Sequence, residues 1–451
     1  MEKETAQKAL EYHANGQPGK IAIAVTKPIE SPEDFSLAYT PGVAAPSMEI
    51  YKERWNAYRY TNKGNLVAII SNGSSVLGLG DIGALASKPV MEGKSMLFKI
   101  FADIDAFDIE IGEEDPDKFI ATVQSLAPTF GGINLEDIKA PECFYIEERL
   151  RALLDIPVLH DDQHGTAVVV AAALMNACEV AGKQPEDIAI TICGAGSAAV
   201  STARMLNSMG IDKKHIVMVD SKGVINTQRT DLNSIKSEFA TERRIGTLQE
   251  AMNGADAFIG LSRGNLLEEK EIMAMKERPV IFALANPTPE ISYSRAKSIR
   301  PDAIVATGRS DAPNQVNNAL AFPYLFRGAL DTLSTTINNE MKIAAAHAIA
   351  SVAHDIADER MKEIYGNILE FGDEYILPKP GDRNLLCKVS VAVAKAAMQS
   401  GVARRGIASF KEYADTLMAR TDHEHFFSKE HIRHRRESDI GKGNRQIRQK
   451  L

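Results

Sequence analysis

The chain has 451 residues, of which 44% are hydrophobic and 25% charged, and this size and composition suit two or three globular domains. A formal net charge of −8 argues against general nucleic-acid binding, because such binding depends on a basic surface that neutralises phosphates. Residues 1–16 are too charged for a signal peptide and the four cysteines show no disulfide spacing, so we expect a cytoplasmic protein.

The first 160 residues combine short elements with many glycine and proline turns. The pattern predicts a helix near Glu4–His13, strands at residues 65–70 and 106–111, and a helix over residues 115–130. Asp115 and Pro116 are typical of the first positions of that last helix. We interpret residues 1–160 as a smaller N-terminal α/β domain.

From residue 161 onward, apolar strands alternate with helices. A buried helix is predicted over residues 165–182, ending at Gly182, and strands at residues 188–193, 215–220, 256–262, 279–287 and 303–308. Helical segments at residues 201–210 and 247–255 separate some of these strands. No uncharged apolar run approaches the ~18 residues that a membrane span needs. The alternation predicts a Rossmann-like, doubly wound parallel sheet within residues 161–390.

Beyond residue 320 the sequence becomes helical, notably at residues 341–357 and 388–401. We assign residues 391–451 to C-terminal helices and a basic tail that could be a linker. Four histidines in this tail could suggest a metal or RNA site, but a solvated helix or linker is the simpler interpretation: they are His423, His425, His431 and His434.

Two glycine-rich loops compete for the role of dinucleotide-binding turn. The early loop has Gly78, Gly80 and Gly83 in the spacing G-x-G-x-x-G, but Pro89 follows closely and predicts that no crossover helix of ordinary length starts there. The later loop lies between a predicted strand and a predicted helix, as the fingerprint requires. We therefore expect the later loop to bind the dinucleotide, through Gly194, Ala195, Gly196, Ser197, Ala198 and Ala199.

Asp220 ends the strand after the later loop, where an acid suits the ribose 2′-hydroxyl of NAD. Lys222 follows it and could instead bind the 2′-phosphate of NADP. These residues leave the choice of dinucleotide open.

Two pairs of acids occur at predicted turns. Glu136 and Asp137 form one pair, and Asp161 and Asp162 lie at a strand-to-helix junction. Carboxylates from separate turns are the ligands that Mg²⁺ or Mn²⁺ prefers, although paired acids are also common on solvated surfaces.

His160 and His164 flank the second acidic pair, four residues apart. A zinc site of this spacing needs H-E-x-x-H within one helix, whereas this segment has Asp in second place and bridges a strand and a helix. We expect one or both histidines to be structural.

Several stretches, taken in order, resemble the malic enzyme family, particularly its bacterial type. They cover roughly residues 10 to 400 and read "YHANGQPGKIAIAVTKPI", "SLAYTPGVA", "VLGLGDIGALASKPVMEGKSMLFK", "NLEDI", "HDDQHGTA", "GAGSAA", "ALANPTPE" and "NQVNNALAFP". The resemblance is to the catalytic part of NADP-dependent enzymes that in some bacteria also carry a phosphotransacetylase-like domain.

The resemblance implies oxidative decarboxylation of (S)-malate to pyruvate and CO₂, with Mg²⁺ or Mn²⁺ and with NADP favoured over NAD. It implies that residues 1–160 form the substrate domain and that the chain is a homodimer. Two alternatives remain: a metal-dependent oxaloacetate decarboxylase or malolactic-type lyase without net redox change, and a non-catalytic dinucleotide-binding regulatory protein.

By motif match, the resemblance also implies residue roles. Tyr39 would be the general acid and Lys94 the general base, supported by Asp161. Glu136, Asp137 and Asp162 would hold the metal. Lys94, Asn286 and Asn318 would contact malate, and Asn286 also the nicotinamide end of the cofactor.

The chemistry fits a lysine base. Hydride leaves C2 of malate only if the C2 hydroxyl loses its proton, and a lysine can accept that proton if its pKa falls from about 10.4 toward 7–8. Burial and a nearby dication both lower the pKa of a lysine.

One position departs from the family pattern. Many animal and plant members carry an arginine before the early glycine loop, where it grips a malate carboxylate, and Ser75 stands there in this chain. We expect backbone amides, asparagines or a lysine such as Lys88 or Lys99 to replace it.

Overall fold

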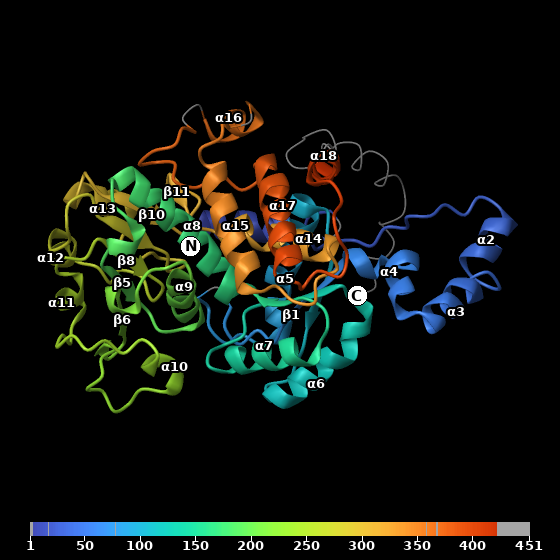
Figure 1. The fold of residues 1–451 in the computed structure, drawn as a ribbon, viewed down its shortest axis with the longest axis horizontal. Helices are drawn as coiled ribbons and strands as arrows, with labels where there is room; N and C mark the ends of the chain where they lie inside the picture. Colours follow the sequence, from blue (N-terminus) through green and yellow to red (C-terminus); the bar gives the residue numbers. More distant parts are fainter. Residues whose placement is uncertain (1–2, 17, 77, 358, 367–368, 422–451) are drawn as a thin grey trace.

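The computed structural model describes residues 3–16, 18–76, 78–357, 359–366 and 369–421. Two mostly parallel sheets follow one another along the chain, with helices packed around both (Figure 1). The predicted α/β fold with a doubly wound sheet is confirmed.

The first sheet has four parallel strands in the order β2-β1-β3-β4. Every residue of the central strand β1 is buried, as expected for a parallel strand covered on both faces. Helices α6 and α7 pack against each other beside this sheet. The strand bounds are β1 Leu66–Ser71, β2 Asp105–Glu110, β3 Gly132–Leu135 and β4 Val158–His160, and the helices are α5 Ala84–Ala102, α6 Pro116–Leu126 and α7 Glu142–Leu153.

The prediction that Pro89 prevents a helix after the early glycine loop is wrong. Helix α5 starts at Ala84 and continues through Pro89 for 19 residues. Proline removes the N–H that would bond to the carbonyl of Leu85, but Leu85 is 84% exposed, so water can satisfy that carbonyl. The crossover between β1 and β2 is therefore a helix of full length.

The second sheet has seven strands in the order β11-β10-β9-β8-β5-β6-β7, and only the β6–β7 pair is antiparallel. Its central strands alternate in the chain with helices. The strands are β5 Ile190–Cys193, β6 Ile216–Asp220, β7 Gly223–Val224, β8 Ala257–Gly260, β9 Val280–Ala283, β10 Ile304–Thr307 and β11 Asn314–Gln315. The helices are α8 Asp161–Ala181, α9 Ser197–Ser208, α10 Ser234–Ser237, α11 Leu248–Met252, α12 Glu269–Met273 and α13 Tyr293–Ile299.

Helix α8 connects the two sheets. By length and composition it could span a membrane, but 67% of its most apolar stretch is buried inside the protein. Its buried side chains belong to one hydrophobic core that includes Val67 of the first sheet and Ile190 of the second. The helix therefore joins the sheets through shared packing.

The C-terminal helices pack back onto the body of the protein. They are α14 Phe322–Asp331, α15 Asn339–Val352, α16 Glu359–Tyr365, α17 Arg383–Gln399 and α18 Phe410–Thr421. Helices α14 and α18 both contact α5 of the first sheet, and α15 contacts α8. The expected boundary at residue 390 lies inside α17, and the four tail histidines lie outside the described residues.

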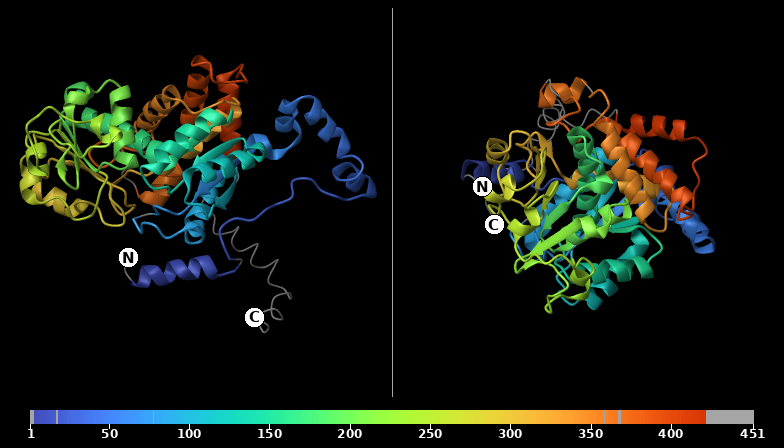
Figure 2. Two further views of the ribbon diagram at one scale, coloured as in Figure 1. Left: turned by 90° about the horizontal axis from the view of Figure 1, so that it is seen from below. Right: turned by 60° about the vertical axis from the view of Figure 1, so that its left-hand side comes forward.

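The N-terminal segment leaves the body as an arm. Helices α1 Lys3–Ala14, α2 Pro32–Ala38, α3 Ala44–Lys52 and α4 Ala57–Tyr60 precede β1, and α2 and α3 project furthest (Figures 1 and 2). Large apolar side chains of this arm face solvent, among them Ile23, Val25, Phe35, Leu37, Tyr39, Met48 and Tyr51. Exposed apolar surface of this extent is typical of an interface.

The four cysteines all lie within the described residues and are unpaired, as expected from their spacing. Cys143, Cys178 and Cys193 are buried, and Cys387 is partly buried.

Candidate active site

Three carboxylates meet where two neighbouring strands of the first sheet end. Glu136 and Asp137 follow β3, Asp162 follows β4, and one oxygen from each lies within 4.8 Å of the others. The carboxyl ends of parallel neighbours share one edge of a sheet, so acids distant in sequence converge there. Asp137 has a positive φ of 53°, and its N–H donates to Asp162 Oδ2 at 2.8 Å, which ties the two turns together.

Lys94, on α5, lies beside these carboxylates. Its ammonium contacts Glu136 Oε1 at 2.9 Å and Asp161 Oδ2 at 2.6 Å, and it lies over the ring of Phe322. Burial lowers the pKa of Lys94, but the charges of Asp161, Glu136 and Asp162 outweigh burial and hold that pKa above its ordinary value. In the protein alone, Lys94 is therefore protonated rather than poised near neutrality.

The same burial acts on the acids. It raises the pKa of Glu136 and of Asp161 to about 7 and that of Asp162 to about 6, against the opposing charge of Lys94. The single ammonium of Lys94 lies among the carboxylates of Glu136, Asp161 and Asp162, so acids outnumber the base at this site. This imbalance favours binding of a further cation.

The donor set fits a hard divalent cation. Oxygen ligands from carboxylates are what Mg²⁺ and Mn²⁺ prefer, and the three acids offer them from two turns fixed to each other. Glu136, Asp137 and Asp162 could therefore hold such an ion, and the ligand role that the resemblance implies for them stays a prediction.

Asp161 points to the lysine. Its Oδ2 also accepts a hydrogen bond from Asn318 Nδ2 at 2.6 Å, so Asn318 is brought to Asp161. Gly165, one turn along α8, leaves space for the carboxyl group: a Cβ there would lie 1.8 Å from Asp161 Oδ1. The requirement for glycine in "HDDQHGTA" is therefore steric.

His160 and His164 are held by a carboxylate that sequence reasoning missed. Glu147 on α7 is buried; its Oε1 accepts the backbone N–H of His160 at 3.0 Å, and its Oε2 lies 2.9 Å from His164 Nε2. Glu147 thereby holds both sides of the turn that carries Asp161 and Asp162. Nothing near Glu147 in the sequence indicated this role, since its partners lie 13 and 17 residues further along the chain, at the end of β4 and in α8.

The later glycine loop has the geometry of a dinucleotide turn. Gly194 follows β5 with a φ of 128°, and a Cβ there would lie 2.4 Å from the carbonyl oxygen of Leu261. Helix α9 starts at Ser197, followed by Ala198 and by Ala199, which is fully buried against the sheet. The loop lines a pocket of about 610 Å³ together with Asp220, Lys236 and Arg263.

Asp220 is held by two cations. Arg229 makes two contacts with its carboxylate, at 2.8 and 3.0 Å, and Lys236 contacts it at 2.7 Å. Burial would raise the pKa of Asp220, but these hydrogen bonds lower it to about 2. Lys222 points elsewhere: its ammonium pairs with Asp231 at 2.7 Å. Lys236 and Arg263 were missed because neither follows the fingerprint at a fixed spacing.

Asn286 lies exposed just beyond β9, at the same edge of the sheet as the dinucleotide loop. The early glycine loop reaches it: a Cβ on Gly78 would lie 2.4 Å from the carbonyl oxygen of Asn286. The early loop thus lets the backbone of the first sheet approach the second.

Tyr39 is not brought to Lys94 within one chain. It ends α2 on the projecting arm and is 65% exposed, whereas Lys94 is buried in the body (Figure 1).

Ser75 lies near the carboxylates, since its N–H donates to the carbonyl of Asp137 at 3.0 Å. The two lysines named among the possible replacements for the missing arginine pair with other acids. Lys88 pairs with Asp108, and Lys99 pairs with Asp103 and Asp105.

Comparison with known proteins agrees with this geometry. Residues 18–151 match the family model of the malic enzyme N-terminal domain, and residues 163–375 match that of the malic enzyme NAD-binding domain. The chain is 54% identical over 422 residues to a protein of Salmonella typhimurium named NADP-dependent malic enzyme, a match that covers 92% of the chain and 55% of that protein.

A protein of the same name from Halomonas elongata is 52% identical over 400 residues, covering 88% of this chain and 95% of that one. The crystal structure of a malic enzyme from Pyrococcus horikoshii superposes with a TM-score of 0.88 at 43% identity, covering 96% and 99% of the two chains. The chain spans about half the length of several curated relatives that it matches.

Proposed function

The chain belongs to the malic enzyme family, and on that basis we propose that it catalyses the NADP⁺-dependent oxidative decarboxylation of (S)-malate to pyruvate and CO₂. One observation carries the proposal beyond family membership. A buried lysine lies within 2.9 Å of Glu136, and Glu136 also belongs to the three-carboxylate cluster. Glu136 therefore belongs to the cation site and also contacts Lys94, the proposed proton acceptor.

The carboxylates of Glu136, Asp137 and Asp162 would hold Mg²⁺ or Mn²⁺. When bound, such an ion acts as a Lewis acid toward the oxygens of the substrate and neutralises the field that now keeps Lys94 protonated.

Lys94 takes the proton from the C2 hydroxyl as hydride moves to the nicotinamide. Asp161 holds the Nζ atom in place through its 2.6 Å contact, and Asn318 in turn holds Asp161 at 2.6 Å. The burial of this lysine excludes water from the proton transfer. Asn286, exposed beyond β9, contacts malate or the nicotinamide.

For the dinucleotide, we assign the 2′-phosphate to Lys236 and Arg263 in place of Lys222. Both line the pocket of the glycine loop, and two cations already neutralise Asp220, so its charge no longer repels a phosphate. This arrangement favours NADP over NAD.

The general acid comes from a second copy of the chain. Tyr39 lies on an arm whose apolar side chains face solvent, with Leu37 66% and Tyr51 85% exposed. A homodimer would bury this surface and could place Tyr39 at the partner's Lys94, where its hydroxyl protonates C3 of enolpyruvate. The free cysteines suit a reducing compartment, and we infer a cytoplasmic location.

The test is an assay with (S)-malate and Mn²⁺, supplied with NADP⁺ or NAD⁺ in separate reactions. We expect pyruvate and NADPH in equal amounts, and Lys94→Ala should lose malate oxidation while it still binds NADP⁺. Pyruvate or lactate formed without reduced cofactor would overturn the proposal in favour of a lyase, and no product at all in favour of a binding protein.

A further inference from the structure

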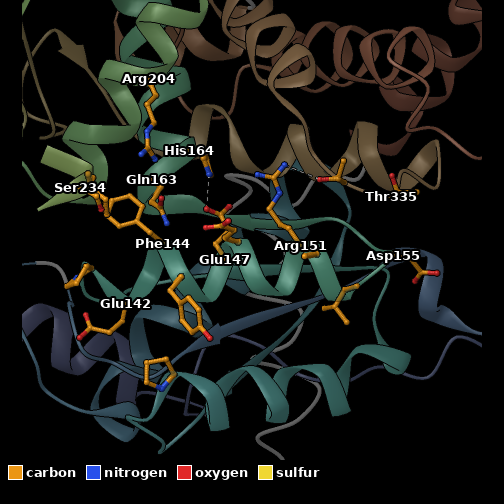
Figure 3. Close-up of a pocket in the computed structure, with 18 residues that line it drawn as sticks. Glu142, Phe144, Glu147, Arg151, Asp155, Gln163, His164, Arg204, Ser234 and Thr335 are labelled. Atoms are coloured by element: carbon orange, nitrogen blue, oxygen red, sulfur yellow. Dashed lines mark hydrogen bonds and ion pairs between the residues drawn. The ribbon is translucent and has the colours of Figure 1, made fainter. Parts of the chain in front are cut away.

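A groove of about 1090 Å³ opens on the far side of the metal turn. It lies between α7, the first turn of α8, α9 and α10, and residues 335–336 close one side of it (Figure 3). Neither the three clustered carboxylates nor the glycine loop lines it. Its size suits a small organic molecule, and it is separate from the site described above.

Hydrogen-bond donors gather in the middle of the groove. Arg151 makes a single contact within the described part of the chain, with Thr336 Oγ1 at 3.3 Å, and has no ion pair there. Gln163 is 2% exposed, its Oε1 accepts from Ser201, and among the described residues its Nε2 donors have no acceptor. A guanidinium without an ion pair among the described residues and an amide with unused donors line the same groove, and together they favour an acceptor that carries negative charge.

Most other charges of the groove are engaged or lie at its ends, and the carboxylate of Glu148, which also lines the groove, is exposed to solvent about one turn from Arg151 on α7. Arg204 pairs with Glu238 at 2.8 Å, and Glu147 is held by the two histidines. Glu142 and Asp155 lie toward opposite ends in Figure 3. Arg151 is therefore the available cation at the centre.

Buried Lys342 places a further cation behind the groove. Its Nζ lies 3.3 Å from His164 Nδ1 and, in the described residues, has no carboxylate in ion-pair distance. Burial and the charges of Arg151 and Arg204 lower the pKa of Lys342 to about 8, against the opposing charges of Glu147 and Glu340. An anion in the groove would relieve this repulsion.

The groove is connected to the metal turn by a chain of hydrogen bonds. Lys342 donates to His164 Nδ1, so His164 donates from Nε2 to Glu147, which also accepts the N–H of His160. Gln163 and His164 themselves follow Asp162 directly on α8. The groove and the metal turn therefore share the first turn of α8.

We propose that this groove is an effector site for a small organic anion, whose carboxylate or phosphate group is bound by Arg151 and Gln163 and whose occupancy strengthens metal binding at Asp162. The added negative charge raises cation affinity at the carboxylates, and by linkage the cation raises anion affinity equally. Anion binding in the groove does not depend on the proposed reaction. The effect of the anion on metal affinity does rest on the proposed function, because it requires that the three clustered carboxylates bind a divalent ion.

Calorimetric titration of the full chain, saturated with NADP⁺, tests the binding. The probes are inorganic phosphate and, separately, glutarate; the variants are Arg151→Gln and Arg149→Gln, the latter an equal charge change on α7 outside the groove. We expect at least one probe to bind wild type and Arg149→Gln with equal affinity. The same probe should bind Arg151→Gln at least about tenfold more weakly. The probe that binds identifies the group as phosphate or carboxylate.

A probe that binds Arg151→Gln as tightly as wild type occupies another site and overturns the proposal, as does the absence of binding by both probes. The coupling is measured as the Mn²⁺ dissociation constant with and without the bound probe. We expect Mn²⁺ to bind a few-fold more tightly with the probe in wild type and unchanged in Arg151→Gln. An unchanged Mn²⁺ affinity in wild type would refute the coupling.

Discussion

Asp161 and Gly165 fit together without room for one more carbon. A Cβ on Gly165 would lie 1.8 Å from Asp161 Oδ1, and the other oxygen of that carboxylate holds Lys94 at 2.6 Å. The position of Lys94, the proposed base, therefore depends on a glycine that has no side chain of its own.

Gly165→Ala should displace the Asp161 carboxylate from Lys94. A shift of about 1 Å in a catalytic contact costs about a hundredfold in rate, and we expect kcat for malate oxidation to fall by that order. Gly93→Ala is the matched control, because only the flexible end of Lys20 approaches its Cβ position, at 3.9 Å. It should retain activity and melt no lower than wild type. Equal activity in both variants would contradict the steric role of Gly165.

Two inactive variants should restore each other if Tyr39 acts across a dimer. Tyr39→Phe and Lys94→Ala each lose malate oxidation, but a mixed dimer has one site with both native residues. We expect mixing after dissociation and reassociation to recover up to about a quarter of the wild-type activity, as random pairing predicts. No recovery, in a mixture shown by mass to contain mixed dimers, would place Tyr39 and Lys94 in the same chain.

Lys236→Gln should raise KM for NADP⁺ about tenfold or more and change KM for NAD⁺ little, because a charge-assisted contact to the 2′-phosphate is lost. Lys222→Gln is its control and should leave both constants near wild type, since Lys222 pairs with Asp231 at the surface. Steady-state kinetics with each dinucleotide decide between the two lysines. A larger effect at Lys222 would reverse the assignment.

His160 should make stability depend on pH. Burial, assisted by the charge of Lys94, lowers its pKa from 6.5 to about 4. Between these values the unfolded chain binds a proton that the folded chain does not, so this group's contribution to stability rises with pH from about 4 to 6.5 and is complete above.

The measurement is urea denaturation of wild type and His160→Leu across that range. The variant keeps the backbone N–H that Glu147 accepts and loses the titration. We expect the wild type to gain about 3 kcal/mol more than the variant between the two ends of the window. Parallel pH profiles would show that the ring is not buried in its neutral form.

Much of the architecture could be predicted because local chemistry determined it. Asp115 caps α6 by accepting the N–H groups of Asp117 and Lys118, and Gly182 ends α8 in a left-handed conformation. The convergence of Glu136 and Asp162 follows from the shared edge of parallel strands. Pro89 was misjudged because its cost depends on whether the carbonyl it leaves free faces water, which only the packed helix reveals.

Other parts of the site depend on contacts that no spacing encodes. Glu147 on α7 contacts His164 on α8, although β4 separates the two helices in the chain. Lys236 contacts Asp220 because α10 packs beside the end of β6. The pKa of Lys94 depends on the balance between burial and three acids, so residue type alone could not give its direction.

The shared core also constrains how this protein can move. Helices α5, α8 and α14 belong to one continuous apolar interior that includes both sheets, so the sheets cannot hinge apart without exposing it to water. A substitution of a buried residue in α8 should accordingly destabilise both sheets together. The chain should then unfold as a single cooperative unit.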